Sequence, residues 1–156
     1  MTKRERVERV YRLQPPDRIP FVPAIYEHKA RLIGRTPSEI CRNAELLRAA
    51  LERELTVYDP DMLVVGVDVY NVEAEALGCA VRYFDDSPEV PAIVEPLLDG
   101  PADLSKLRLP DPETGGRMPL YLEVAGSLVR DHAADMIIRG AVTGPFSLAS
   151  ELLGPE

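Results

Sequence analysis

Apolar residues recur at the three- and four-residue spacing of an amphipathic helix in several stretches of the chain. A first helix is expected to start after Thr2 and must end before Pro15, because proline inside a helix removes a hydrogen bond and clashes with the preceding turn. A short helix is expected to start at Pro37. The same spacing predicts further helices over residues 43–57, 72–77, 118–132 and 146–153.

Polar and glycine residues mark where these helices begin and end. Thr2 and Thr36 each precede a glutamate by three residues, which is the pattern of a capping box. Asn43 and Asn71 stand in front of two other helices as expected N-caps. Gly78 follows the helix over 72–77, at the position where a left-handed residue usually ends a helix.

Near-continuous apolar runs over residues 62–69 and 136–142 predict strands that are covered on both faces. Residues 20–25 form a shorter apolar run, and we expect a first buried strand there although two prolines interrupt it. A further strand is expected over 79–84, and the proline-rich stretch 88–116 is expected to be loop with at most short helices. This alternation predicts an α/β fold with a parallel sheet covered by helices.

Composition sets limits on what the chain binds. Its 156 residues are 46% apolar, which is enough for a folded core, and a formal net charge of −8 disfavours nucleic acid or an anionic membrane as the main partner. No apolar run approaches the roughly 20 residues of a membrane helix. The charged start does not resemble a secretory signal, and the two cysteines lie far apart, so we expect a cytoplasmic protein.

Ligands of parallel α/β folds bind at the C-terminal ends of the strands, which selects residues 26–28, 68–71 and 143–146. Asp68 interrupts a run of valines where a buried strand emerges, and we take it as the candidate catalytic residue. A carboxylate at this place can bind a cationic or N–H-rich ligand, or stabilise positive charge during a reaction. Two structural alternatives stay open: Asp68 caps the helix near Asn71, or it pairs with a nearby arginine.

The strand ends and their surroundings also supply candidate substrate-binding residues, which are Tyr70, His28, Lys29, Arg31 and Phe146. Lys29 and Arg31 place positive charge near the first strand, although a surface role is equally open, and His28 fits the start of a helix as well. His132 is expected to interact with the negative end of its own helix.

Other polar residues have plainer expected roles. Cys41 and Cys79 have no partner at metal-ligand spacing, so we expect small core residues and no metal site within this chain. Glu73 and Glu75 are expected to be solvated on different sides of a short helix.

Three segments, in this order, resemble the uroporphyrinogen decarboxylase superfamily: TKRERVERV with PPDRIPFVP, YDPDMLVVGVDVYNVEAEALGC, and RGAVTGPFSLASELLG. The resemblance implies an eight-stranded TIM-type (β/α)8 barrel that binds a tetrapyrrole or a related substrate at its C-terminal face. Asp68 matches the family aspartate that contacts pyrrole N–H groups. Lys29, Arg31 and Arg35 are candidates for binding substrate carboxylates, whereas Glu151 stands where the decarboxylases have a tyrosine.

The superfamily implies two reactions. One is cofactor-free decarboxylation of porphyrinogen acetate side chains in haem synthesis, which is our main expectation. The alternative is zinc-dependent methyl transfer from a corrinoid protein, which the segment VEAEALGC resembles more closely. In the methyltransferase branch the resemblance places the zinc ligands in the C-terminal half, outside this chain.

Length then bears on completeness. A barrel of this type takes about 250 residues, so we expect residues 1–156 to be the N-terminal part of a single barrel domain. A third hypothesis is therefore a non-catalytic fragment that needs a complementing chain. The isolated chain is expected to be inactive and, because an open half-barrel exposes a strand edge, to self-associate.

Overall fold

The computed structural model describes residues 1–68 and 71–154. Its helices and strands, in chain order, are α1 (Lys3–Tyr11), α2 (His28–Arg31), α3 (Pro37–Ile40), α4 (Ala44–Tyr58), β1 (Met62–Val65), α5 (Val72–Leu77), β2 (Val81–Arg82), β3 (Ala92–Ile93), the 3-10 helix η1 (Pro101–Lys106), α6 (Met118–His132), β4 (Ile137–Gly140) and α7 (Pro145–Leu153). None of the helices in these ranges is long and apolar enough to cross a membrane.

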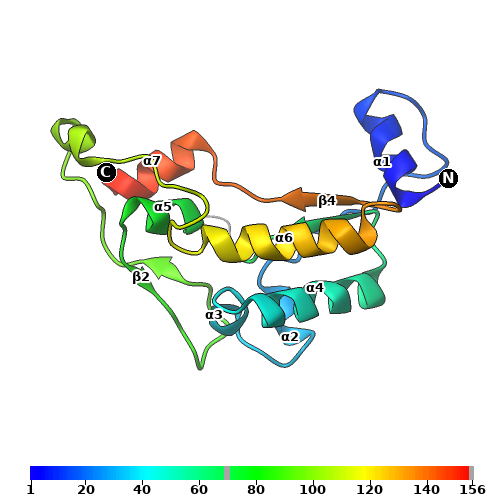
Figure 1. The fold of residues 1–156 in the computed structure, drawn as a ribbon, viewed down its shortest axis with the longest axis horizontal. Helices are drawn as coiled ribbons and strands as arrows, with labels where there is room; N and C mark the ends of the chain where they lie inside the picture. The colour runs from blue at the N-terminus through cyan, green and yellow to red at the C-terminus, as the bar shows by residue number, and fades with distance from the viewer. Residues whose placement is uncertain (69–70, 155–156) are drawn as a thin grey trace.

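Strands β1 and β4 form the parallel pair at the centre of the molecule. Their register runs from Met62 opposite Ile137 to Val65 opposite Gly140. Both strands are shorter than the apolar runs that predicted them, but their parallel pairing is as expected. Helices α4 and α6 lie side by side along the pair, as Figure 1 shows. The main core lies between these helices and β1, where Leu47, Leu51 and Leu63 are fully buried.

The predicted first strand over 20–25 is wrong, because these residues form no strand. Proline has no N–H to donate to a strand ladder. This segment instead contacts Asp61, the residue before β1, through Phe21. The N–H of Phe21 donates to the Asp61 carboxylate (2.7 Å), and the N–H of Asp61 donates to the Phe21 carbonyl (2.8 Å).

A side chain takes the place of the missing strand along the free edge of β1. The carbonyl of Val65 accepts from the N–H of Ala141 on the β4 side, so the carbonyls of Val64 and Gly66 point the other way. Both accept hydrogen bonds from the ammonium group of Lys29, at 3.1 and 2.8 Å. The Lys29 side chain therefore covers this edge of the sheet.

The helix starts follow the predicted caps in three of four cases. Thr2 and Thr36 form complete capping boxes, and the Asn43 side chain accepts from the N–H of Leu46 at 3.0 Å. Asn71 is the exception, since its side chain makes no capping hydrogen bond to α5. Gly78 ends α5 with a φ of 114°, the left-handed conformation that glycine adopts at little cost.

Residues after α5 form a second, smaller unit at one end of the molecule. β2 and β3 pair antiparallel, with Val81 opposite Ile93 and Arg82 opposite Ala92. The predicted strand over 79–84 is thus reduced to two residues. A second core joins α5, the loop after β3 and α7, and its buried members are Ala74, Cys79, Leu98 and Leu152.

Helix α1 closes the other end of the strand pair (Figure 1). Its Arg4 donates from the backbone N–H to the carbonyl of Asp135 (2.7 Å) and from Nε to the carbonyl of Ala133 (2.8 Å). Arg6 is 7% exposed and donates to the carboxylates of Asp17 and Asp61 at 2.7 and 2.6 Å. The first helix is therefore anchored to the turn before β4 and to the residue before β1.

Candidate functional site

A cavity of about 380 Å³ opens where β1 and β4 end. Its lining residues are Val65, Gly66, Asp68, Val72, Glu73, Pro112, Met118, Tyr121, Leu122, Ala125, Gly140, Ala141, Val142 and Thr143. We call it the strand-end cavity. It is mainly apolar, its wall includes two carboxylates, and none of its described lining residues is a lysine, arginine or histidine. A second cavity of about 430 Å³, bounded by Tyr26, Phe84 and Val90, also borders Asp68.

Asp68 is almost fully buried at the wall of the strand-end cavity, with 1% of the residue exposed. One carboxylate oxygen accepts from the Asn71 amide at 2.6 Å, and the other accepts from Nη2 of Arg117 at 2.9 Å. Of the structural alternatives for Asp68, pairing with an arginine is the one observed. Burial raises the pKa of Asp68 above its usual range, and the charge of Arg117 opposes this rise only in part.

Arg117 connects Asp68 to its neighbours and lies just before α6. Its Nε donates to Glu75 at 2.5 Å, and its guanidinium carbon lies 5.4 Å from the centre of the Tyr83 ring. The hydroxyl of Tyr83 donates to the same glutamate at 2.8 Å. The expectation that Glu75 is solvated is therefore wrong, because its carboxylate joins α5 to the residue after β2 and to the residue before α6.

Asn71 links Asp68 to the hairpin of β2 and β3. Its side-chain amide donates to the Asp68 carboxylate and also to the carbonyl of Pro91. Asn71 also has a helical backbone conformation, with φ −108° and ψ −15°, rather than the extended one usual for a capping residue. Two sets of hydrogen bonds thus connect the hairpin to Asp68. In the first, Asn71 bonds to both Asp68 and Pro91. In the second, Arg117 bonds to Asp68 and to Glu75, which accepts from Tyr83.

Glu73 is the second carboxylate of the strand-end cavity. It accepts hydrogen bonds from the backbone N–H of Thr143 at 3.1 Å and from the Thr143 hydroxyl at 2.7 Å. The prediction of a solvated Glu73 is wrong, since the side chain ties α5 to the residues that follow β4. These partners are 70 residues apart, so no local pattern marks the contact.

Lys29, predicted to bind substrate, is almost fully buried and lines a separate cavity of about 160 Å³ rather than the strand-end cavity. The residue is 1% exposed, and its ammonium lies 3.4 Å from Glu54 besides the two carbonyls of the β1 edge. Burial lowers the pKa of Lys29 and raises that of Glu54. The ammonium is committed to the interior of the fold.

His28 and Arg31 line a different cavity of about 500 Å³, together with Arg35 and residues 86–88. Nε2 of His28 lies 2.8 Å from the Tyr58 hydroxyl, and His28 is the first residue of α2. Arg31 is exposed. The structure therefore does not bring either residue to the strand-end cavity.

The remaining candidates lie away from the strand-end cavity as well. Phe146 is 88% exposed on α7 and is not part of the cavity lining. Tyr70 lies outside the described residues. Of the named catalytic and substrate-binding candidates, Asp68 alone is among the described residues that line this cavity. Thr143, from the third strand end selected from the sequence, lines it as well.

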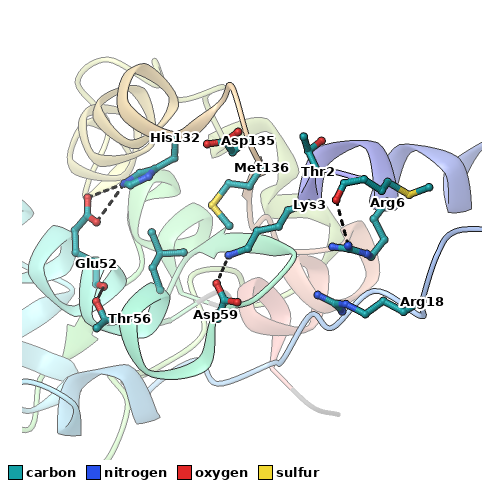
Figure 2. Close-up of a pocket in the computed structure, with 12 residues that line it drawn as sticks. Thr2, Lys3, Arg6, Arg18, Glu52, Thr56, Asp59, His132, Asp135 and Met136 are labelled. Atoms are coloured by element: carbon teal, nitrogen blue, oxygen red, sulfur yellow. Dashed lines mark hydrogen bonds and ion pairs between the residues drawn. The ribbon is translucent and has the colours of Figure 1, made fainter.

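A larger hollow of about 710 Å³ lies at the opposite end of the strands, bounded by residues that precede β1 and β4. Figure 2 shows that Lys3 faces Asp59 and that His132 faces Glu52. Lys3 pairs with Asp59, and Nε2 of His132 lies 2.9 Å from Glu52. His132 thus joins α6 to α4. The Lys3–Asp59 ion pair and the His132–Glu52 hydrogen bond thus hold neighbouring elements together around this hollow.

The chain does not fit a metal centre within its described residues. No group of three or more histidine, cysteine, aspartate or glutamate side chains in these ranges could hold a metal ion. Cys41 and Cys79 are free and buried in different cores, which agrees with the predicted role of small core residues.

Comparison with known proteins places the chain in a family. The Uroporphyrinogen decarboxylase (URO-D) family matches residues 2–156. The chain therefore belongs to the URO-D family, as its motifs indicated.

Two curated relatives of this chain are named methyltransferases. The methylcobamide:CoM methyltransferase MtbA of Methanosarcina acetivorans is 29% identical, and that of Methanosarcina mazei is 28% identical, each over 98% of this chain. The chain spans 45% of the length of these relatives.

A solved structure of a methyltransferase from Methanosarcina mazei has the same fold. It matches 99% of this chain with a TM-score of 0.82 at 21% identity, and this chain covers 46% of it. The predicted fold, an incomplete TIM-type α/β barrel, is confirmed.

Proposed function

We propose that this chain forms the N-terminal half of a barrel that transfers a methyl group between a corrinoid and a thiol. The observation that carries the proposal is the chemistry of the strand-end cavity, which is apolar and has no basic side chain among its described lining residues. A methyl group is small and uncharged, and its transfer is favoured where water is excluded. An apolar wall suits such a group.

The same cavity suits porphyrinogen decarboxylation less well. Uroporphyrinogen carries acetate and propionate side chains, and carboxylates are recognised mainly by arginine and lysine. Here the wall instead presents Asp68 and Glu73, and Lys29 is held inside the fold by Glu54. The names of the curated relatives favour methyl transfer as well.

In the proposed reaction, the methyl carbon leaves the cobalt of a methylcobamide and bonds to the sulfur of a thiol such as CoM. The cobalt retains the electron pair of the broken bond, and the thiol loses its proton. Because the described residues do not fit a zinc site, any zinc ligands would come from the other half of the barrel. Two free cysteines support a reducing cytoplasm as the compartment.

Reconstitution tests the proposal. The 156-residue chain is mixed with the separately expressed part of the M. acetivorans MtbA that it does not match, with zinc supplied. Methylcobalamin and CoM are added, and methyl-CoM is measured by mass spectrometry. Each half alone is the control, and uroporphyrinogen is offered to the same mixture in parallel.

Methyl-CoM formed only by the combined halves is the expected result. Decarboxylated porphyrinogen from that mixture would instead establish the decarboxylase reaction and overturn the proposal. A stable complex of the halves with neither activity would also overturn it, and would favour the non-catalytic fragment.

A further inference from the structure

Arg117 occupies an unusual position for a charged side chain, since it is 7% exposed and lies beside the candidate catalytic residue. Arg117 is the residue before α6, and it lies 49 residues after Asp68 in the chain. Its Nη2 donates to Asp68 at 2.9 Å and its Nε to Glu75 at 2.5 Å. One guanidinium therefore serves two carboxylates, and the three groups carry a net charge of −1 when both acids are ionised.

The ionisable groups around Asp68 come from several elements. Arg117 is the cation, Glu75 approaches from α5, Tyr121 from α6, and Cys41 from the end of α3. Burial raises the pKa of Tyr121 and of Cys41, so both are neutral near pH 7. The charge of Asp68 thus depends on the balance between burial, the cation Arg117 and the anion Glu75.

We propose that Arg117 is a positioning residue for Asp68, which fixes the orientation of that carboxylate and keeps it ionised at the wall of the strand-end cavity. This role deepens the proposed function and rests on it, because Asp68 matters for turnover only if substrate enters the cavity. The geometry favours a role beyond holding helices together. Arg117 places separate N–H groups on Asp68 and Glu75, whereas a residue that joined α6 to α5 would need only the contact with Glu75.

The titration of Asp68 tests this role on the 156-residue chain itself. The chain is labelled with carbon-13 at the aspartate carboxyl group, and the Asp68 signal is assigned by its absence from Asp68→Asn. Arg117→Met is expected to raise the pKa of Asp68 by about one to three units, because it removes the opposite charge that favours ionisation. Arg117→Lys retains the charge and is expected to give a smaller rise.

Arg42 offers a matched control. Its guanidinium carbon lies 4.4 Å from the centre of the same Tyr83 ring, and it pairs with Asp85 rather than with Asp68. Arg42→Met is therefore expected to leave the Asp68 titration unchanged. Glu75→Gln is expected to lower the pKa of Asp68, because it removes a nearby negative charge. If Arg117→Met does not fold, Arg117→Lys decides the matter, because it changes the group that contacts Asp68 directly.

An Asp68 titration that is the same in the folded wild type, Arg117→Met and Glu75→Gln would overturn the inference. An equal shift in Arg42→Met would also overturn it, since the effect would then follow from packing against Tyr83. The titration does not depend on methyl transfer. A failed reconstitution with the expected titration would therefore refute the proposed function and leave the coupling of Arg117 to Asp68 intact.

Discussion

Replacing Lys29 by methionine tests whether this residue serves the fold or the substrate. Methionine has a similar length but no charge, so the exchange removes the ammonium group and keeps most of the buried chain. In the native protein that group donates to the carbonyls of Val64 and Gly66 and lies 3.4 Å from Glu54. Lys29→Met leaves all three acceptors without this donor.

The expected cost follows from burial. The side chains of Lys29 and Glu54 are each 2% exposed, and removing one member of a buried ion pair destabilises a protein by about 3–5 kcal/mol. That loss is a large share of a typical folding free energy of about 5–15 kcal/mol. A double variant, Lys29→Met with Glu54→Leu, removes both charges and is expected to recover much of the loss.

The loss is also expected to depend on pH. Burial raises the pKa of Glu54 in the folded state, and removing Lys29 raises it further. The folded variant then binds a proton more tightly than the unfolded chain, so its stability falls as the pH rises. Lys29→Met is therefore expected to be less destabilised at pH 5 than at pH 7.

Urea unfolding followed by circular dichroism measures these differences. Lys3→Met is the matched control, because Lys3 pairs with Asp59, whose side chain is 78% exposed, and exposed pairs contribute only about 0–1 kcal/mol. Equal, small losses in Lys29→Met and Lys3→Met would refute the buried-pair argument. A fully stable Lys29→Met with lost substrate affinity would instead restore the substrate-binding role.

Other substitutions test separate parts of the molecule. In the reconstituted enzyme, Asp68→Asn is expected to lower the methyl-transfer rate by about a hundredfold or more, whereas His132→Ala leaves it nearly unchanged; equal rate losses would contradict this ranking. Burial tends to raise the pKa of Asp61, but bonds from the Phe21 N–H and two arginines hold it below its usual range. Wild-type stability should therefore fall as the pH drops below 4, and Asp61→Asn should flatten that dependence in acid-unfolding curves while costing about 3 kcal/mol at pH 7. Glu73→Gln is expected to speed amide hydrogen exchange in residues 141–144, since it weakens the bonds that hold the loop after β4; unchanged exchange would show that these bonds do not hold it.

Local signals in the sequence were enough for many elements. Thr2 and Thr36 lie within a few residues of the backbone groups they cap, so their patterns predicted helix starts correctly. The valine-rich run after Asp61 predicted β1 for a similar reason, because consecutive apolar residues mark a buried strand. The parallel pairing with β4 followed from the alternation of strands and helices.

Long-range polar contacts could not be predicted in the same way. Asp68 was identified from its place at a strand end, but its partner Arg117 lies 49 residues later, in a segment without a distinguishing motif. Lys29 was a candidate for binding substrate carboxylates because the family resemblance implies basic residues at this place after the first strand. Its true neighbours are set by the failure of residues 20–25 to pair as a strand, which leaves carbonyls on the β1 edge for the ammonium group.

The anchoring of α1 has a consequence for synthesis on the ribosome. This helix is made well before the residues that it contacts, because Arg4 bonds to the carbonyls of Ala133, Asp135 and Met136. At about 5–20 residues per second, translation takes on the order of ten seconds to reach those partners. A nine-residue helix is only marginally stable alone in water. Helix α1 therefore has no partner for these three bonds until residues 133–136 have been made, so it reaches its final packing well after its own synthesis.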